Sequence, residues 1–308
     1  GLENFMMLGE LSLDGSLVAV KGVLPIAINA RSEGFKSIIV PLENANEAAV
    51  VEGIHVYGFS HIREVTDFLN GKQQAEPFTF DPTLSEVTND LLYDFKDVKG
   101  QETVKRALEI AAAGAHNLLM VGAPGSGKTM LARRLPGILP PMTVEESLET
   151  TKIHSVAGKL SRNCSLITTR PFRSPHHTIS PIALIGGGAF PRPGEISLAT
   201  NGVLFLDELT EFQRNVLEVM RQPLEDRKIT ISRARYSVDY PANFMLIASM
   251  NPCPCGYYNH PTKECTCSGS AIQHYLSKIS GPLLDRIDMH IEVVPVELEK
   301  IAGIQEAD

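Results

Sequence analysis

The sequence predicts an α/β fold built on a mainly parallel sheet, and two observations carry that prediction. Beyond residue 92, helical and strand patterns alternate: "ETVKRALEIAAAGA" has helical periodicity, "HNLLMVG" is a buried strand, and a helix follows from Gly127. Two further apolar runs, "VLFL" and "FMLIASM", indicate buried strands later in the chain. Strands that alternate with helices form βαβ units, whose strands run parallel.

The first 71 residues predict a smaller α/β unit. Strand-like alternation surrounds an Asp14-Gly15 turn, an amphipathic helix ends at Gly34, and the buried strand "SIIVP" precedes a second helix from about Asn44. Residues 72–92 are polar and interrupted by proline, which is typical of a linker. We therefore expect three parts: a unit over 1–71, a linker over 72–92 and a larger domain over 93–308.

Composition restricts the class of protein. The 308 residues are 43% apolar, which is enough for roughly two domains, at least one of them with a full core. The 28 basic and 36 acidic side chains give a formal net charge of −8, so any DNA contact must be local. No apolar stretch is long enough for a membrane span and no signal peptide is evident, so we expect a cytoplasmic protein with no membrane partner.

The segment "GAPGSGKT" at residues 122–129 matches the phosphate-binding loop G-x-x-x-x-G-K-[ST]. It lies between a buried strand and a helix, where its glycines allow successive backbone N–H groups to surround phosphate oxygens. We expect Lys128 to bind the β- and γ-phosphates of ATP and Thr129 to bind Mg²⁺.

The segment "NGVLFLDEL" supplies the carboxylates that such a site requires. Asp207 is expected to hold Mg²⁺ and Glu208 to orient or deprotonate the attacking water. Asn251 ends the apolar run "FMLIASM", from where its amide can position that water. The predicted nucleotide-binding residues are Gly122, Ala123, Pro124, Gly125, Ser126, Gly127, Lys128, Thr129 and Asp207.

Arg286, in "GPLLDRID", has two interpretations. It can act as an arginine finger on the γ-phosphate of a neighbouring subunit. Alternatively it forms a plain salt bridge with Asp285 or Asp288.

Two arginine-bearing segments are candidates for contact with DNA. The stretch between Lys128 and Asp207 is longer than one crossover needs and includes a Gly-, Pro- and Arg-rich segment, residues 168–199, with Arg192. The segment "RKITISRARYSVDYPANF" alternates as a hairpin with Arg233 and Arg235 near its tip. Such arginines contact phosphates without reading bases, or they solubilise surface hairpins. The adjacent pair His176-His177 is a poor metal site, because neighbouring side chains in extended backbone point apart.

Four cysteines form the pattern C-x-C-x₉-C-x-C: Cys253, Cys255, Cys265 and Cys267. Residues i and i+2 of extended backbone share a face, so a modest bend brings both thiolates of a pair onto one tetrahedral zinc ion. Gly256 allows the turn, and His260 can replace one ligand. Free thiols in a surface loop remain the alternative.

The order of "DFKDVKGQ", "GAPGSGKT", "GVLFLDEL", "ASMNPCPCG" and "ISGPLLDRID" closely resembles the magnesium-chelatase-like AAA+ ATPases, and in particular the ComM (YifB) family. The resemblance implies a three-layer AAA+ P-loop domain after a partial Lon-protease-like unit of the S5 domain 2 type, with the C-terminal lid truncated at Asp308. Its helix 2 and pre-sensor 1 insertions correspond to the two arginine-bearing segments. Leu24 stands at the position of the Lon catalytic lysine, so we expect no protease activity.

The resemblance also implies a function. It predicts a homo-hexameric, ATP- and Mg²⁺-dependent DNA motor that acts on single-stranded or branched DNA and promotes branch migration during natural transformation. By the resemblance, Lys128 and Thr129 belong to the Walker A motif, and Asp207 and Glu208 to the Walker B motif. Asn251 is sensor 1, and Arg286 is the arginine finger that acts in trans. The family's cysteine motif also favours structural zinc. The alternatives are a chelatase-type ATPase that remodels a protein partner without DNA, and a nucleotide-binding regulatory module.

Overall fold

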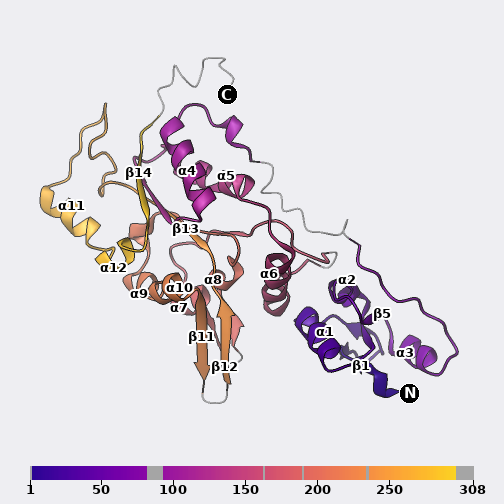
Figure 1. The fold of residues 1–308 in the computed structure, drawn as a ribbon. Coiled ribbons are helices and arrows are strands. Elements are labelled where there is room, and N and C mark those ends of the chain that lie inside the picture. Colours follow the sequence, from indigo (N-terminus) through magenta and orange to yellow (C-terminus); the bar gives the residue numbers. More distant parts are fainter. Residues whose placement is uncertain (1, 82–92, 162–163, 189–190, 234–235, 296–308) are drawn as a thin grey trace. The chain divides into compact units, whose positions relative to one another are not determined.

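The computed structural model describes residues 2–81, 93–161, 164–188, 191–233 and 236–295 (Figure 1). The chain forms two compact units: Gly1–Val87 with Met142–Thr169, and Thr88–Pro141 with Arg170–Asp308. The boundaries expected at residues 71 and 92 stay a prediction. The segment Met142–Thr169, however, packs with the N-terminal residues although it lies within the predicted second domain.

The larger unit is built on a five-stranded sheet in which every paired strand is parallel. In chain order the strands are β6 (Leu118–Gly122), β7 (Phe172–Arg173), β10 (Val203–Leu206), β13 (Met245–Met250) and β14 (Met289–Val293). Their spatial order is β14-β6-β13-β10-β7. The parallel sheet and its three predicted buried strands are therefore confirmed, and β6 lies between β13 and β14.

Helices cover this sheet. The helix α4 (Glu102–Gly114) precedes β6, and α5 (Lys128–Arg134) follows it. Both contribute apolar side chains to the core around Leu118, Met120 and Phe205. The remaining elements of the unit are η5 (Phe95–Asp97), η6 (Leu135–Ile138), α7 (Pro181–Ile185), β8 (Gly186–Gly187), β9 (Arg192–Pro193), α8 (Glu195–Leu198), η7 (Leu209–Glu211), α9 (Arg214–Glu218), α10 (Arg221–Asp226), β11 (Lys228–Arg233), β12 (Tyr236–Pro241), α11 (Gly269–Leu276) and α12 (Gly281–Leu284).

Both arginine-bearing segments contain hairpins. The strands β11 and β12 pair antiparallel from Lys228↔Pro241 to Arg233↔Tyr236, which confirms the predicted hairpin. Figure 1 shows it extending away from the helices α9 and α10. In the other segment β8 and β9 form a shorter antiparallel pair between α7 and α8.

Asn117 fixes the amino ends of three strands of the sheet. Its side-chain Nδ2 donates to the carbonyl oxygen of Arg286 at 2.9 Å, and its Oδ1 accepts from the backbone N–H of Leu246 at 2.8 Å. Its own backbone N–H donates to Asp288 Oδ2 at 2.9 Å. Because Asn117 immediately precedes β6, these bonds join the starts of β6, β13 and β14.

The smaller unit contains a parallel sheet of β1 (Phe5–Met7), β4 (Ser37–Pro41) and β5 (His55–Phe59) in the order β1-β4-β5. The predicted helix is α1 (Val23–Ser32), whose Leu24 is fully buried. Short strands β2 (Glu10–Leu11) and β3 (Leu17–Val18) flank the predicted turn. The other elements are η1 (Leu2–Asn4), η2 (Leu42–Asn44), α2 (Ala45–Ala48), α3 (Ile62–Leu69) and α6 (Val144–Ala157).

A buried polar group fixes α6 within the smaller unit. Ser155 Oγ, on α6, donates to Glu47 Oε2 at 2.8 Å, and Asn44 Nδ2 donates to Glu47 Oε1 at 2.7 Å. Burial raises the pKa of the Glu47 carboxyl above its usual range. Among the residues described in either unit, no helix is both long and apolar enough to cross a bilayer.

Candidate nucleotide-binding site and cysteine loop

The phosphate loop, residues 122–129, connects β6 to α5 at the carboxyl end of the sheet. Gly125 and Gly127 have φ values of 77° and 91°, in the left-handed region that only glycine adopts without strain. A Cβ atom on Gly122 would lie 2.4 Å from the carbonyl oxygen of Val293 on the adjacent strand. These glycines therefore set the path of the loop, as the motif predicts.

Lys128 is held inside this loop. Its Nζ donates to the carbonyl oxygens of Gly122 and Ala123 at 2.7 and 2.9 Å, and to Asn251 Oδ1 at 3.3 Å. Burial lowers the pKa of the Lys128 ammonium, while the carboxylates of Asp207 and Glu208 oppose that shift. These three hydrogen bonds go to neutral oxygens, so the buried cation is poised to accept a negatively charged ligand.

Thr129 and Asp207 form the second half of the site. Thr129 Oγ1 donates to Asp207 Oδ2 at 2.7 Å. The other carboxylate oxygen, Oδ1, accepts from Ser249 Oγ and from the backbone N–H of Glu208 at 3.1 Å. A hydroxyl and a carboxylate are hard oxygen ligands of the kind that Mg²⁺ prefers, so this pair fits the ion that the phosphate-loop motif implies.

Glu208 has an unusual backbone for a non-glycine residue. Its φ is 55°, in the left-handed region, and it directly follows Asp207 at the start of η7. Its side chain is largely exposed, and its Oε2 lies 3.8 Å from Nδ1 of His177. Strained residues of this kind cluster at functional sites, which agrees with the catalytic role expected for Glu208.

The structure thus brings together Lys128, Thr129, Asp207 and Asn251, with Glu208 beside them. Sequence reasoning missed two neighbours. Ser249 lies on β13, two residues before Asn251, which directly follows the strand, so strand alternation could have placed both on one face. His177 carries no local signal, because only the folding of the segment after β7 places it beside Glu208.

Ser249 has a measurable consequence for metal binding. Replacing it with alanine removes the hydroxyl that orients Asp207, so we expect the Mg²⁺ affinity of the nucleotide complex to fall roughly 10- to 100-fold. Titration of nucleotide binding against Mg²⁺ measures this. Ser277→Ala, an exposed position after α11, is the matched control and should leave the Mg²⁺ dependence unchanged. An unchanged Mg²⁺ titration in Ser249→Ala contradicts the assignment.

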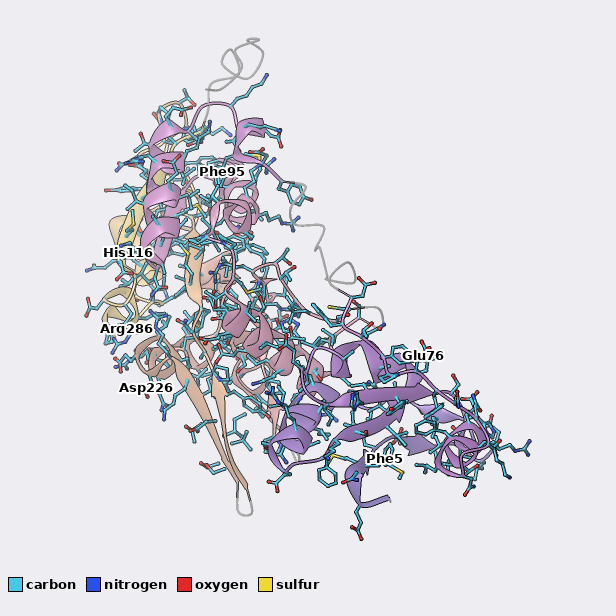
Figure 2. The ribbon with its side chains drawn as sticks, turned by 45° about the vertical axis from the view of Figure 1, so that its right-hand side comes forward. Phe5, Glu76, Phe95, His116, Asp226 and Arg286 are labelled. Carbon is cyan, nitrogen blue, oxygen red and sulfur yellow. The ribbon has the colours of Figure 1, made fainter. Side chains whose placement is uncertain are left out.

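Arg286 lies far from the phosphate loop of its own chain. It precedes β14 and its carbonyl is bound by Asn117, so it sits at the amino end of the strands, whereas the phosphate loop follows their carboxyl end. Its guanidinium pairs with Glu225 on α10, and Figure 2 shows it close to Asp226 at the end of that helix. The salt bridge expected with Asp285 or Asp288 is wrong, because Asp288 instead accepts from the backbone of Asn117 and Arg286 faces α10.

Two of the candidate DNA-contacting arginines lie on strands of the two hairpins. Arg192 is exposed on β9. Arg233 ends β11, and Arg235 lies outside the described residues. Other arginines of the first segment have structural partners: Arg173 forms a bidentate pair with Glu195 at 2.6 and 2.8 Å.

The four cysteines 253, 255, 265 and 267 come together in a single cluster. Their sulfur atoms all lie within 4.8 Å of one another, and none forms a disulfide. The pKa of the Cys255 thiol is lowered to about 6, chiefly by a hydrogen bond from the backbone N–H of Tyr257. His260 is not part of the cluster. Its Nδ1 accepts from the backbone N–H groups of Thr262 and Lys263 at 3.2 and 3.1 Å.

The parallel sheet, the glycine-shaped loop after β6 and the acidic pair after β10 define a P-loop nucleotide-binding domain. Comparison with known proteins agrees. The family model "Magnesium chelatase, subunit ChlI" matches residues 94–301, and "Subunit ChlI of Mg-chelatase" matches residues 1–44. The chain belongs to the magnesium-chelatase-like AAA+ family, within its ComM (YifB) branch.

Individual relatives match along most of the chain. The competence protein ComM of Haemophilus influenzae is 46% identical over 95% of this chain and 57% of its own length. The uncharacterised protein YifB of Escherichia coli is 46% identical over 95% of this chain and 56% of its own length. An uncharacterised protein of Mycobacterium tuberculosis is 45% identical over 95% of this chain and 57% of its own length. The chain therefore spans little more than half the length of these relatives.

Proposed function

We propose that this chain binds and hydrolyses ATP as the catalytic part of a hexameric DNA motor that promotes branch migration of recombination intermediates. The assignment of the ATP site rests on the buried Lys128 cation beside the Thr129–Asp207 pair. Because Lys128 bonds to neutral oxygens, its positive charge is available to bind phosphate. Mg²⁺ supplies charge neutralisation of the phosphates when bound.

Each residue then has a defined role. Backbone N–H groups of the phosphate loop and Lys128 bind the phosphates, and Thr129 and Asp207 hold the ion. Glu208 accepts a proton from the attacking water, and Asn251 helps to orient that water. Arg286 serves the site of the neighbouring subunit, which its position at the opposite end of β6 from the phosphate loop supports.

The DNA part of the proposal rests on the two hairpins and on the relatives. A relative at 46% identity carries the name competence protein. Arg192, Arg233 and Arg235 would contact phosphates without reading bases, which suits a motor that moves along any sequence. Repetition in a ring multiplies this small basic surface on an otherwise acidic chain.

The test is ATP hydrolysis by the intact protein with and without branched or single-stranded DNA. We expect DNA to raise the rate, and the combined change Arg192→Ala, Arg233→Ala and Arg235→Ala to weaken DNA binding and flatten its salt dependence. Arg106→Ala on α4, whose side chain is exposed and pairs with Glu109, is the control. No stimulation by any DNA contradicts the motor.

The second candidate is a chelatase-type ATPase that remodels a protein partner. The net charge of −8 and the match to a magnesium chelatase subunit favour it. It shares the ATP site but predicts that a partner protein, and not DNA, stimulates hydrolysis.

A further inference from the structure

The four sulfur atoms of the cysteine cluster are spaced as ligands of one metal ion. Cys253 Sγ lies 3.4 Å from Cys255 Sγ and 3.7 Å from Cys265 Sγ, and Cys255 Sγ lies 3.6 Å from Cys265 Sγ. A tetrahedral zinc ion with Zn–S bonds of about 2.3 Å places its sulfur ligands about 3.8 Å apart. A disulfide would require about 2 Å. The three separations among Cys253, Cys255 and Cys265 are close to that value, and Cys267 Sγ lies within 4.8 Å of the other three sulfur atoms.

No regular secondary structure orders the chain that surrounds the cluster. Residues 251–268 connect β13 to α11 and contain no helix or strand. Loops of this length without regular structure are uncommon in compact domains unless something else orders them. The backbone N–H of Cys255 donates to Cys267 Sγ at 3.4 Å, which joins the two halves of the loop. A bound ion would supply the cohesion that hydrogen-bonded strands supply elsewhere.

The cysteine loop, residues 251–268, also packs directly on the phosphate loop. Gly256 has a φ of 83°, and a Cβ atom there would lie 2.5 Å from Cδ of Pro124. The loop starts at Asn251, which accepts a hydrogen bond from Lys128. A cavity of about 320 Å³ lies beside this contact, lined by Ala123 of the phosphate loop and by Pro252 and Tyr258 of the cysteine loop.

We propose that the four cysteines bind one zinc ion, and that the zinc-closed loop holds Pro124 and Asn251 so that the phosphate loop keeps its nucleotide-binding shape. The thiols bind as thiolates and release their protons to solvent, and soft sulfur ligands select zinc over Mg²⁺. With four protein ligands the ion has no open position, so its role is structural. The effect on nucleotide affinity rests on the function proposed above; the zinc site does not.

The first experiment measures metal content. Zinc is quantified in the purified intact protein, in the double variant Cys265→Ser with Cys267→Ser, and in the control Cys164→Ser, whose cysteine lies in the other unit. We expect about one zinc ion per chain in the intact protein and in the Cys164→Ser control, and a large loss of zinc from the double variant. Cobalt titration of metal-free protein should give the visible absorption of a tetrahedral thiolate site. Protein that holds no zinc and gives no cobalt spectrum overturns the proposal.

The second experiment measures the coupling. Affinity for a fluorescent ATP analogue is determined with Mg²⁺ in excess, before and after a zinc-selective chelator, and again after zinc is restored. We expect removal to weaken binding about tenfold or more, reversibly. Gly256→Ala should keep zinc yet weaken nucleotide binding, because its Cβ would displace Pro124. Unchanged affinity after zinc removal overturns the coupling, whereas failure of the zinc-loaded protein to bind nucleotide overturns the proposed function and leaves the metal result standing.

Discussion

Replacing Lys128 with alanine is expected to lower both nucleotide affinity and ATP hydrolysis, the latter by about 10²- to 10³-fold. The reason is that Lys128 places a buried positive charge between the phosphate loop and Asn251, with its Nζ bonded to neutral oxygens. Binding of a fluorescent ATP analogue and release of phosphate measure the two effects separately.

Two further variants sharpen this test. Lys128→Arg keeps the charge but not the compact ammonium that fits between the carbonyl oxygens of Gly122 and Ala123, so it should also be impaired. Lys96→Ala, an exposed lysine on η5 that pairs with Asp94, should behave as the unchanged protein. Full hydrolysis in Lys128→Ala would show that the ATP site lies elsewhere.

Replacing Glu208 with glutamine is expected to separate binding from chemistry. The amide cannot accept a proton from water, so hydrolysis should fall about 10²- to 10⁴-fold. Nucleotide affinity should change little, because the phosphates are expected to contact the loop and Lys128. Single-turnover hydrolysis, together with an equilibrium binding curve, measures both quantities.

The matched control for that change is Glu211→Gln. Glu211 lies three residues further along, at the end of η7, and pairs with Lys278 at 3.8 Å. It should hydrolyse ATP normally. A Glu208→Gln variant that retains the full rate would remove Glu208 from the chemistry, and loss of binding in that variant would make its role structural.

The phosphate-binding loop was predictable from the sequence because its signals are local. A buried strand, glycines at fixed spacing and a following helix occur within a few residues, and the structure places them as β6, the loop and α5. The strand β10, which Asp207 follows, and the β11–β12 hairpin were predictable for the same reason. Each is defined by residues that are neighbours along the chain.

The features that sequence reasoning missed depend on contacts between distant residues. Arg286 has aspartates two residues or fewer away, yet its guanidinium meets Glu225 because α10 packs beside it. The helix α6 carries a clear capping box at Thr143 and Glu146, so its start was readable. Its packing against α1 was not readable, because most of the buried side chains of α6 are polar and no apolar face of the helix marks the contact.

Asn117 has a mechanical consequence. By joining Arg286, Leu246 and Asp288 to the start of β6, it prevents the three strands from sliding past one another at their amino ends. Strand β13 has Leu246 near its amino end, and Asn251 directly follows its carboxyl end. The Arg286 segment is therefore linked through Asn117 and β13 to the carboxyl end of the sheet, where the phosphate loop lies.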